Sequence, residues 1–186
     1  MNTDVLIVGG GPGGVITAAV GRTIYPDKTF TLVRREPKAV VPCGIPYIYN
    51  RLNSAEENIM GDAPLNTKEV NLVIDTVTHV DRSGKTAFLE SGQEIAFEKL
   101  VLATGSSPTA PPALKASEYT GIYVINKDLD YLRDMREKIQ SAQNVVIVGG
   151  GFIGVEIADE IRQSFVKNLM LYDIVEHLVE QSFDEE

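Results

Sequence analysis

Short runs of consecutive apolar residues alternate with helix-like stretches near the start of the chain. Residues Val5–Val8 form an uninterrupted apolar run, which is typical of a strand buried on both faces of a parallel sheet. Apolar residues then recur near helical spacing in residues 15–25, Pro26 ends that stretch, and Phe30–Val33 predicts a second strand. The pattern predicts one strand–helix–strand unit.

The same pattern returns near the end of the chain. Residues Asn144–Val148 predict a strand, residues 153–165 a helix and Leu169–Tyr172 a second strand. The helix positions expected to face inward are Ile153, Ile157, Ile161 and Phe165. The chain therefore contains two strand–helix–strand units, the first and the second being separated by other elements.

Alternating apolar and polar residues between 71 and 98, interrupted by Ser-Gly pairs, favour three antiparallel strands. Residues 99–103 resume a buried strand, and the prolines that follow read as a linker. After the linker, Asn126 is placed to cap a helix with one apolar face, formed by Leu129, Leu132, Met135 and Ile139.

These elements predict an α/β protein with two domains. Residues 1–110 form the N-terminal part of a Rossmann-like domain that carries a three-stranded antiparallel insertion. Residues 111–186 contribute the first βαβ unit of a second Rossmann-like domain, whose two strands are too few for a stable sheet.

Composition and charge narrow the function classes. The chain has 186 residues, 44% of them hydrophobic, and a formal net charge of -9 without a basic run, so we expect no nucleic-acid partner. The uncharged stretch Val5–Gly21 contains six glycines and follows Asp4, which argues against a leader or a membrane span. His79 and His177 lack partners at metal-ligand spacing, so no metal site is predicted.

A G-x-G-x-x-G turn follows the first strand of each unit. The first glycine of such a motif makes a tight turn, the second lets the backbone approach a pyrophosphate, and the third lets the helix pack closely on the strand. The helix N-terminus then faces the phosphates. The residues concerned are Gly9, Gly11, Pro12, Gly13 and Gly14 in the first unit and Gly149, Gly151 and Gly154 in the second.

An acidic residue at the end of the next strand binds the ribose of a dinucleotide and repels a 2′-phosphate. In the second unit Asp173 occupies this position, 19 residues after Gly154, which favours NADH over NADPH. In the first unit the position holds Arg34, and Glu36 lies two residues further on the same side of the strand. Glu36 is therefore the candidate ribose ligand there, and the effect of Arg34 stays open.

Two further segments carry a family resemblance: Leu100–Ser107, which reads LVLATGSS, and Pro42–Tyr47, which reads PCGIPY. With the two glycine motifs, the chain resembles the single-cysteine group of the pyridine nucleotide-disulfide oxidoreductases, which includes NADH oxidase, NADH peroxidase and coenzyme A disulfide reductase. The resemblance implies that the first unit binds FAD and the second NAD(H). It also implies that Ala103, Thr104 and Gly105 form a turn that closes against the flavin nucleotide.

Cys43 matches the redox cysteine of that group. In such enzymes hydride passes from NADH to flavin, and the electrons then reach a nearby sulfur or an oxygen species. Pro46 suits the first turn of a helix extending through Leu52, which would place Cys43 ahead of its positive end and favour a thiolate. The alternative is a small buried thiol without chemistry. A single cysteine also fits a reducing compartment, so the cytoplasm is the expected location.

Three further residues are substrate or cofactor candidates by resemblance. Arg22 matches a basic residue that contacts coenzyme A phosphates, Tyr47 is placed to approach the cysteine, and Glu156 resembles an acid near the nicotinamide. Ala39 and Pro42 stand where coenzyme A reductases commonly have Ser and Asn, so specificity for coenzyme A is an open question.

The family continues beyond the region that this chain matches, with the rest of both nucleotide domains and a dimerisation domain. We therefore expect a C-terminally truncated chain whose full-length form is a homodimer acting on a small-molecule oxidant, with little turnover by the fragment alone. A non-catalytic nucleotide-binding module, or an electron-transfer subunit completed by a partner chain, is the alternative. A rubredoxin-type reductase is a third possibility, against which Cys43 argues.

Overall fold

A computed structural model describes residues 1–114, 119–164 and 168–179. The chain divides into two compact units: residues 1–41 and 60–107 form the first, and residues 42–59 and 108–186 form the second. The segment that carries Cys43 thus groups with the second nucleotide motif, although it lies between strands of the first unit in the sequence.

The first unit is built on a six-stranded sheet in the order β5-β2-β1-β8-β7-β6. Its parallel part consists of β5 (Asn71–Ile74), β2 (Phe30–Arg34), β1 (Asn2–Val8) and β8 (Glu94–Leu102). Helix α1 (Pro12–Ile24) connects β1 to β2, which completes the predicted strand–helix–strand unit. The Rossmann-like fold class expected from the sequence is confirmed.

The alternating region between residues 71 and 98 differs in detail from the prediction. Residues 71–74 form β5, which pairs in parallel with β2, and only 77–81 (β6) enters the antiparallel insertion. The insertion continues through β7 (Thr86–Leu89) and ends in β8, which pairs antiparallel with β7 and parallel with β1. A single nine-residue strand therefore replaces the two short strands expected between 94 and 103.

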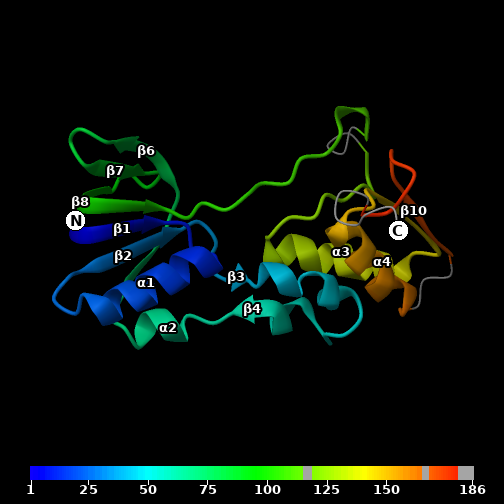
Figure 1. Cartoon of the computed structure of the whole chain (residues 1–186), viewed down its shortest axis with the longest axis horizontal. Helices are drawn as coiled ribbons and strands as arrows, with labels where there is room; N and C mark the ends of the chain where they lie inside the picture. The colour runs from blue at the N-terminus through cyan, green and yellow to red at the C-terminus, as the bar shows by residue number, and fades with distance from the viewer. Residues whose placement is uncertain (115–118, 165–167, 180–186) are drawn as a thin grey trace. The chain divides into compact units, whose positions relative to one another are not determined.

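The two faces of this sheet are covered by different elements (Figure 1). One face packs against α1 and the short helix α2 (Ala63–Asn66), through Val15, Ala18 and Leu65. On the other face, Leu6 and Val33 of the parallel strands form a buried cluster with Ala87 and Leu89 of the antiparallel strand β7. Burial of both faces explains the continuous apolar runs of the parallel strands.

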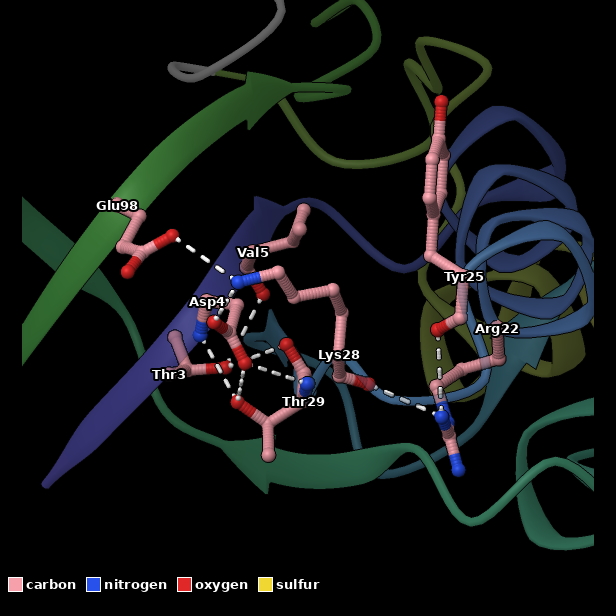
Figure 2. A network of polar contacts seen from close by, with 8 residues as sticks. All are labelled: Thr3, Asp4, Val5, Arg22, Tyr25, Lys28, Thr29 and Glu98. Carbon is pink, nitrogen blue, oxygen red and sulfur yellow. Dashed lines mark hydrogen bonds and ion pairs between the residues drawn. The ribbon is translucent and has the colours of Figure 1, made fainter.

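A polar network fixes the beginning of β1 to the start of β2 (Figure 2). The Asp4 carboxylate accepts hydrogen bonds from the Thr29 backbone N–H and the Thr29 hydroxyl, both at 2.7 Å, and from Lys28 Nζ at 2.8 Å. Lys28 Nζ also lies 3.4 Å from a carboxylate oxygen of Glu98 on β8. These donors stabilise the ionised carboxylate, and they hold the pKa of Asp4 well below its ordinary value, with Lys28 the largest cause.

The low pKa of Asp4 predicts an acid-sensitive contribution to stability. A carboxyl whose pKa is lower in the folded than in the unfolded chain adds stability above the unfolded value, here 3.8, and this contribution is lost as the pH falls below it. Asp4→Asn should therefore lower the urea midpoint at pH 7 and lose less stability than the wild type on acidification. Asp27→Asn, at an exposed carboxyl of the adjoining loop, is the control. If the urea midpoint of Asp4→Asn fell on acidification as much as that of the wild type, the proposed contribution of the Asp4 carboxylate to stability would be contradicted.

The second unit contains the repeated strand–helix–strand pattern. Strands β9 (Asn144–Val148) and β10 (Asn168–Tyr172) pair in parallel, and α4 (Phe152–Arg162) connects them. On α4, Ile157 and Ile161 are buried as expected, whereas Ile153 is 62% exposed, so its inward placement was wrong. The fourth expected inward position, residue 165, lies outside the described residues.

Helix α3 (Leu129–Ser141) precedes β9 and has the predicted apolar face, formed by Leu129, Leu132, Met135 and Ile139. Its N-cap is not Asn126 as predicted but Asp128, whose side chain accepts a hydrogen bond from the Tyr131 N–H at 2.8 Å. The Asn126 side chain instead accepts a hydrogen bond from the Asp128 N–H at 2.9 Å. Asn126 therefore orders the residue that caps the helix.

The remaining elements are short. Strands β3 (Ala39–Val40) and β4 (Ile59–Met60) flank the cysteine segment, which consists of the 3₁₀ turns η1 (Pro42–Gly44), η2 (Pro46–Tyr49) and η3 (Ala55–Asn58). A fourth turn, η4, spans Pro112–Leu114. In the described part of the chain, no helix combines the length and the apolar character needed to cross a bilayer.

Candidate functional site: two glycine elbows and a cysteine segment

The first glycine elbow has the backbone geometry that only glycine allows. Gly9 adopts a φ of +112°, and a Cβ at this position would overlap the backbone carbonyl of Ala103. A Cβ on Gly14 would overlap the carbonyl oxygen of Gly9, because α1 packs directly on the turn. The first and third glycines of the motif therefore shape the turn, as the sequence pattern predicts.

The second elbow repeats this geometry. Gly149 has a φ of +113°, and a Cβ on Gly154 would overlap the carbonyl oxygen of Gly149. Gly151 is the N-cap of α4, as Gly11 is of α1, and both have extended backbone conformations. Two segments 140 residues apart, at Gly9 and Gly149, thus form the same turn.

The middle glycines leave open space in front of each helix N-terminus. A Cβ built on Gly11, Gly13 or Gly151 would meet no other atom within 4 Å. Such a cradle, bordered by backbone N–H groups and the positive end of a helix, fits a diphosphate. The residues present therefore fit a dinucleotide at each elbow.

The turn at Ala103, Thr104 and Gly105 lies against the first elbow. The Ala103 N–H donates to the Val8 carbonyl at 2.8 Å, and the Ala103 carbonyl closely approaches Gly9. Gly105 adopts a φ of +71°, which turns the chain away after β8. This turn is therefore part of the elbow, at the carboxyl end of the parallel strands where ligands of open α/β sheets bind.

Asp173 lies at the second elbow, as expected for a ribose ligand. Its Oδ2 accepts a hydrogen bond from the Gly150 N–H, and its Oδ1 accepts from the Ile174 N–H at 2.6 Å. These backbone donors, Gly150 first, lower the pKa of the Asp173 carboxyl below its ordinary value. A fixed carboxylate beside the diphosphate cradle can accept hydrogen bonds from ribose hydroxyls and disfavours a 2′-phosphate.

Arg34 occupies the equivalent position at the first elbow, but its guanidinium is held elsewhere. Arg34 is buried, and it makes a bidentate pair with Asp62 at 2.6 and 2.8 Å and donates to the Pro37 carbonyl at 2.8 Å. Its aliphatic stem lies against Gly10, where a Cβ would overlap it. The Arg34 side chain therefore packs against the first elbow at Gly10.

Glu36, the alternative acid, is half-buried and accepts hydrogen bonds from Arg35 at 2.9 and 2.6 Å. Its role as ribose ligand stays a prediction. Asp62, which the sequence analysis did not single out, is the residue that makes a buried arginine possible here.

Cys43 is exposed and lies in η1, within the second unit. The helix expected from Pro46 through Leu52 is absent: the structure has the four-residue 3₁₀ turn η2, which ends at Tyr49. So short a turn lacks the helix dipole that was expected to favour a thiolate at Cys43. Exposure of the thiol contradicts the alternative of a buried, inert cysteine.

The cysteine segment is fixed to α3 by polar contacts. Arg136 of α3 donates to the carbonyls of Ile48 and Leu52, the latter at 2.8 Å. The buried hydroxyl of Tyr49 donates to Met135 Sδ at 3.1 Å. These contacts position the segment although only its turns are regular.

Gly44, the residue after Cys43, is a position at which we expect even a small side chain to disturb the structure. A Cβ there would overlap Oδ1 of Asn58, a buried side chain with little room to move. Gly44→Ala should displace η1, lower the unfolding midpoint and change the rate at which Cys43 reacts with a thiol reagent. Gly61→Ala, where a Cβ would meet nothing within 4 Å, is the control. Equal behaviour of the two variants would show that the packing of Gly44 is unimportant.

The other candidate residues lie in different surroundings. Arg22 donates to the backbone carbonyls of Lys68 and Lys28, both at 3.0 Å, and so ties the end of α1 to its neighbours. Glu156 is exposed on α4, and Tyr47 is exposed on η2. Among the described residues, no group of three potential ligands is arranged to hold a metal ion.

The fold and the two elbows define a protein with two dinucleotide-binding units. A profile described as pyridine nucleotide-disulphide oxidoreductase matches residues 3–186, and the chain belongs to this family. Members of the family are flavin-dependent pyridine nucleotide oxidoreductases that bind FAD and NAD(P)H. The resemblance expected from the sequence is thereby confirmed.

Individual relatives share sequence or fold with the chain. It is 32% identical over 197 aligned positions to an NAD(P)H coenzyme A polysulfide/persulfide reductase of Pyrococcus horikoshii, covering 100% of this chain and 43% of that protein. It is 28% identical over 164 positions to an NADH oxidase of Methanocaldococcus jannaschii, covering 82% and 36%. The solved structure of an NAD-dependent persulfide reductase from A. fulgidus superposes with a TM-score of 0.86 at 23% identity, covering 99% and 36%. The chain thus spans less than half the length of these relatives.

Proposed function

We propose that the whole protein is an FAD-dependent NADH oxidoreductase that passes electrons through Cys43 to a disulfide, a persulfide or an oxygen species. The observation that supports the proposal most strongly is the pair of equivalent glycine elbows. The first elbow is bordered by the turn at Ala103, Thr104 and Gly105, and the second is followed by Asp173. Two dinucleotides can be held by one such chain, and electron transfer between them is the chemistry for which that arrangement is suited.

Each unit has a separate role in this proposal. Gly9–Gly14 and the N-terminus of α1 would hold the diphosphate of FAD, with Glu36 on the ribose. Gly149–Gly154 would hold that of NADH, with Asp173 on the ribose selecting against NADPH and Glu156 facing the nicotinamide end. FAD, when bound, accepts a hydride from NADH and passes on the electron pair.

Cys43 would be the residue that the acceptor meets. Its thiolate attacks a disulfide sulfur, so that a new S–S bond forms to Cys43, the bond in the acceptor breaks and one thiolate leaves. The electron pair that originates from NADH then breaks the S–S bond of the mixed disulfide, which restores the Cys43 thiolate and releases the other half of the acceptor as a second thiolate. With an oxygen species as acceptor, Cys43 would cycle through a sulfenic acid instead.

Replacing Cys43 tests this step. Cys43→Ser preserves the size of the side chain, so flavin binding should be unchanged, while NADH-dependent disulfide reduction should fall at least about a thousandfold because serine is not a comparable nucleophile. The measurement is NADH consumption by the whole protein with disulfide acceptors, beside the bound flavin per chain. Disulfide turnover equal to the wild type would remove Cys43 from the mechanism.

A further inference from the structure

The strand that leads to the ribose position ends differently in the two units. In the second unit, Asp173 directly follows β10 and brings its own carboxylate to the elbow. In the first unit, Arg34 is the last residue of β2, and its side chain is only 2% exposed. The side chain of Asp62, which pairs with Arg34, is 31% exposed. The group that a ligand can reach at this pair is therefore the acid and not the guanidinium.

The Arg34 side chain extends from the first elbow to Asp62. The Gly9 N–H donates to the Val33 carbonyl at 2.8 Å, so β2 ends against the elbow. A Cβ on Gly10 would overlap Cβ and Cδ of Arg34, which places the stem of that side chain beside the glycine turn. At the other end, Nη1 and Nη2 of Arg34 lie 2.6 and 2.8 Å from Oδ1 and Oδ2 of Asp62. These contacts connect the elbow to one carboxylate within the first unit.

The Asp62 carboxylate does not serve its own helix. Asp62 is the N-cap residue of α2, a position at which aspartate is preferred because its side chain accepts a hydrogen bond from the first helical turn. In the described structure of α2 this cap hydrogen bond is absent, and both carboxylate oxygens contact Arg34 instead. The ion pair therefore turns the carboxylate away from the role that its position in the chain predicts.

The pair also has a cost that a purely structural role does not explain. Arg34 Nε is buried, and among the described residues it has no hydrogen-bond partner. Replacing a buried ion pair with apolar side chains of similar size is often neutral or stabilising, but it would remove the fixed carboxylate. Because Arg34 uses one lone-pair direction on each Asp62 oxygen, each oxygen keeps another for a further donor.

We propose that Asp62 accepts a hydrogen bond from a ribose hydroxyl of the dinucleotide held at the first elbow, and that Arg34 is the positioning residue that holds its carboxylate. An acid 28 residues further along the chain then supplies the acceptor that β2 itself lacks. Ribose has two adjacent hydroxyls, so Asp62 acts beside Glu36, the acceptor named in the proposed function. This inference rests on the proposed binding of FAD at that elbow.

Competition between two nucleotides tests the assignment through binding alone. ADP carries both ribose hydroxyls, and 2′,3′-dideoxy-ADP carries neither. The whole protein with bound FAD is titrated with each nucleotide, and the released FAD is measured by its fluorescence after ultrafiltration. The ratio of the two inhibition constants reports the hydroxyl preference of the elbow that holds FAD, because general damage to the elbow weakens both nucleotides alike. In the wild type, hydrogen bonds to charged acceptors should make ADP bind at least about tenfold more tightly.

Two double variants separate the acceptor from the ion pair. Arg34→Met with Asp62→Ala removes both, whereas Arg34→Met with Asp62→Asn removes the pair but keeps a side-chain oxygen. Both leave the net charge unchanged and no charge buried without its partner. The preference for ADP should fall at least about threefold in the alanine variant and less in the asparagine variant. Asp173→Asn, at the other elbow, is the control and should change the preference less than about twofold.

An unchanged preference in the alanine variant would overturn the role of Asp62, and so would an equal loss in the two double variants, since the ion pair alone would then matter. If the alanine variant does not fold, Asp62→Glu takes its place: it keeps the pair, moves the carboxylate by one methylene and should lower the preference at least about twofold. A whole protein that binds no FAD would contradict the proposed function. If FAD binds and these variants keep the wild-type preference, only the inference about Asp62 fails.

Discussion

Replacing Gly11 with alanine is expected to remove FAD from the protein while NADH binding remains. The backbone of Gly11 is extended, with φ -75° and ψ -176°, and a Cβ would meet no protein atom within 4 Å, so alanine is accommodated without strain. The added methyl group would instead occupy the space in which a diphosphate approaches the N-terminus of α1. Loss of one or two hydrogen bonds to phosphate, each about 1.5–3 kcal/mol, weakens binding by at least about tenfold.

The mirror variant at the second elbow provides the matched control. Gly151 has φ -72° and ψ 179° and equally open surroundings, so Gly151→Ala should weaken NADH binding and leave flavin in place. Flavin content after gel filtration and NADH affinity by fluorescence titration measure the two effects. Loss of both ligands in both variants, or of neither, would contradict separate dinucleotide sites at the two elbows.

Gly14→Ala is expected to destabilise the first unit itself. Alanine is a better helix former than glycine by about 1 kcal/mol, so helix propensity alone predicts stabilisation at this position in α1. The added methyl group would, however, overlap the carbonyl oxygen of Gly9, which is backbone and cannot rotate away. Separating α1 from the turn should cost about 3 kcal/mol, which exceeds the propensity gain.

Thermal unfolding of Gly14→Ala beside Gly11→Ala separates packing from ligand binding. Both variants add one methyl group to the same turn, but only the one at Gly14 meets backbone. We expect a midpoint several degrees lower for Gly14→Ala and an unchanged midpoint for Gly11→Ala, both measured without added nucleotide. Equal midpoints would show that the third glycine does not serve helix packing.

The parts of the fold that sequence patterns predicted are those with a local physical cause. Continuous apolar runs give β1 and β2 because both faces of these strands are covered. The same kind of run gives β9, although Val146 and Val148 are exposed on it. Glycine spacing gives both elbows because the turn requires a positive φ at Gly9 and Gly149 and close packing at Gly14 and Gly154. Asp173 follows from its place at a strand end.

The features that the sequence left open depend on partners far along the chain. Arg34 is tolerated in a buried strand because Asp62, 28 residues later, neutralises it, and no local pattern identifies that acid. The short turn η2 stands where a helix was expected, and the carbonyls of Ile48 and Leu52 are bound by Arg136, 84–88 residues away, a partner that no local pattern identifies.

The central claim is that one elbow holds FAD, the other holds NADH, and electrons pass between the two. Its most direct test is the visible absorption spectrum of the whole protein during anaerobic addition of NADH. We predict a yellow protein with one flavin per chain whose flavin absorption bleaches as NADH is added, and whose Gly151→Ala variant keeps the colour but bleaches only at much higher NADH concentration. A colourless protein that retains no added flavin, or a flavin band that NADH leaves unchanged, would contradict the account.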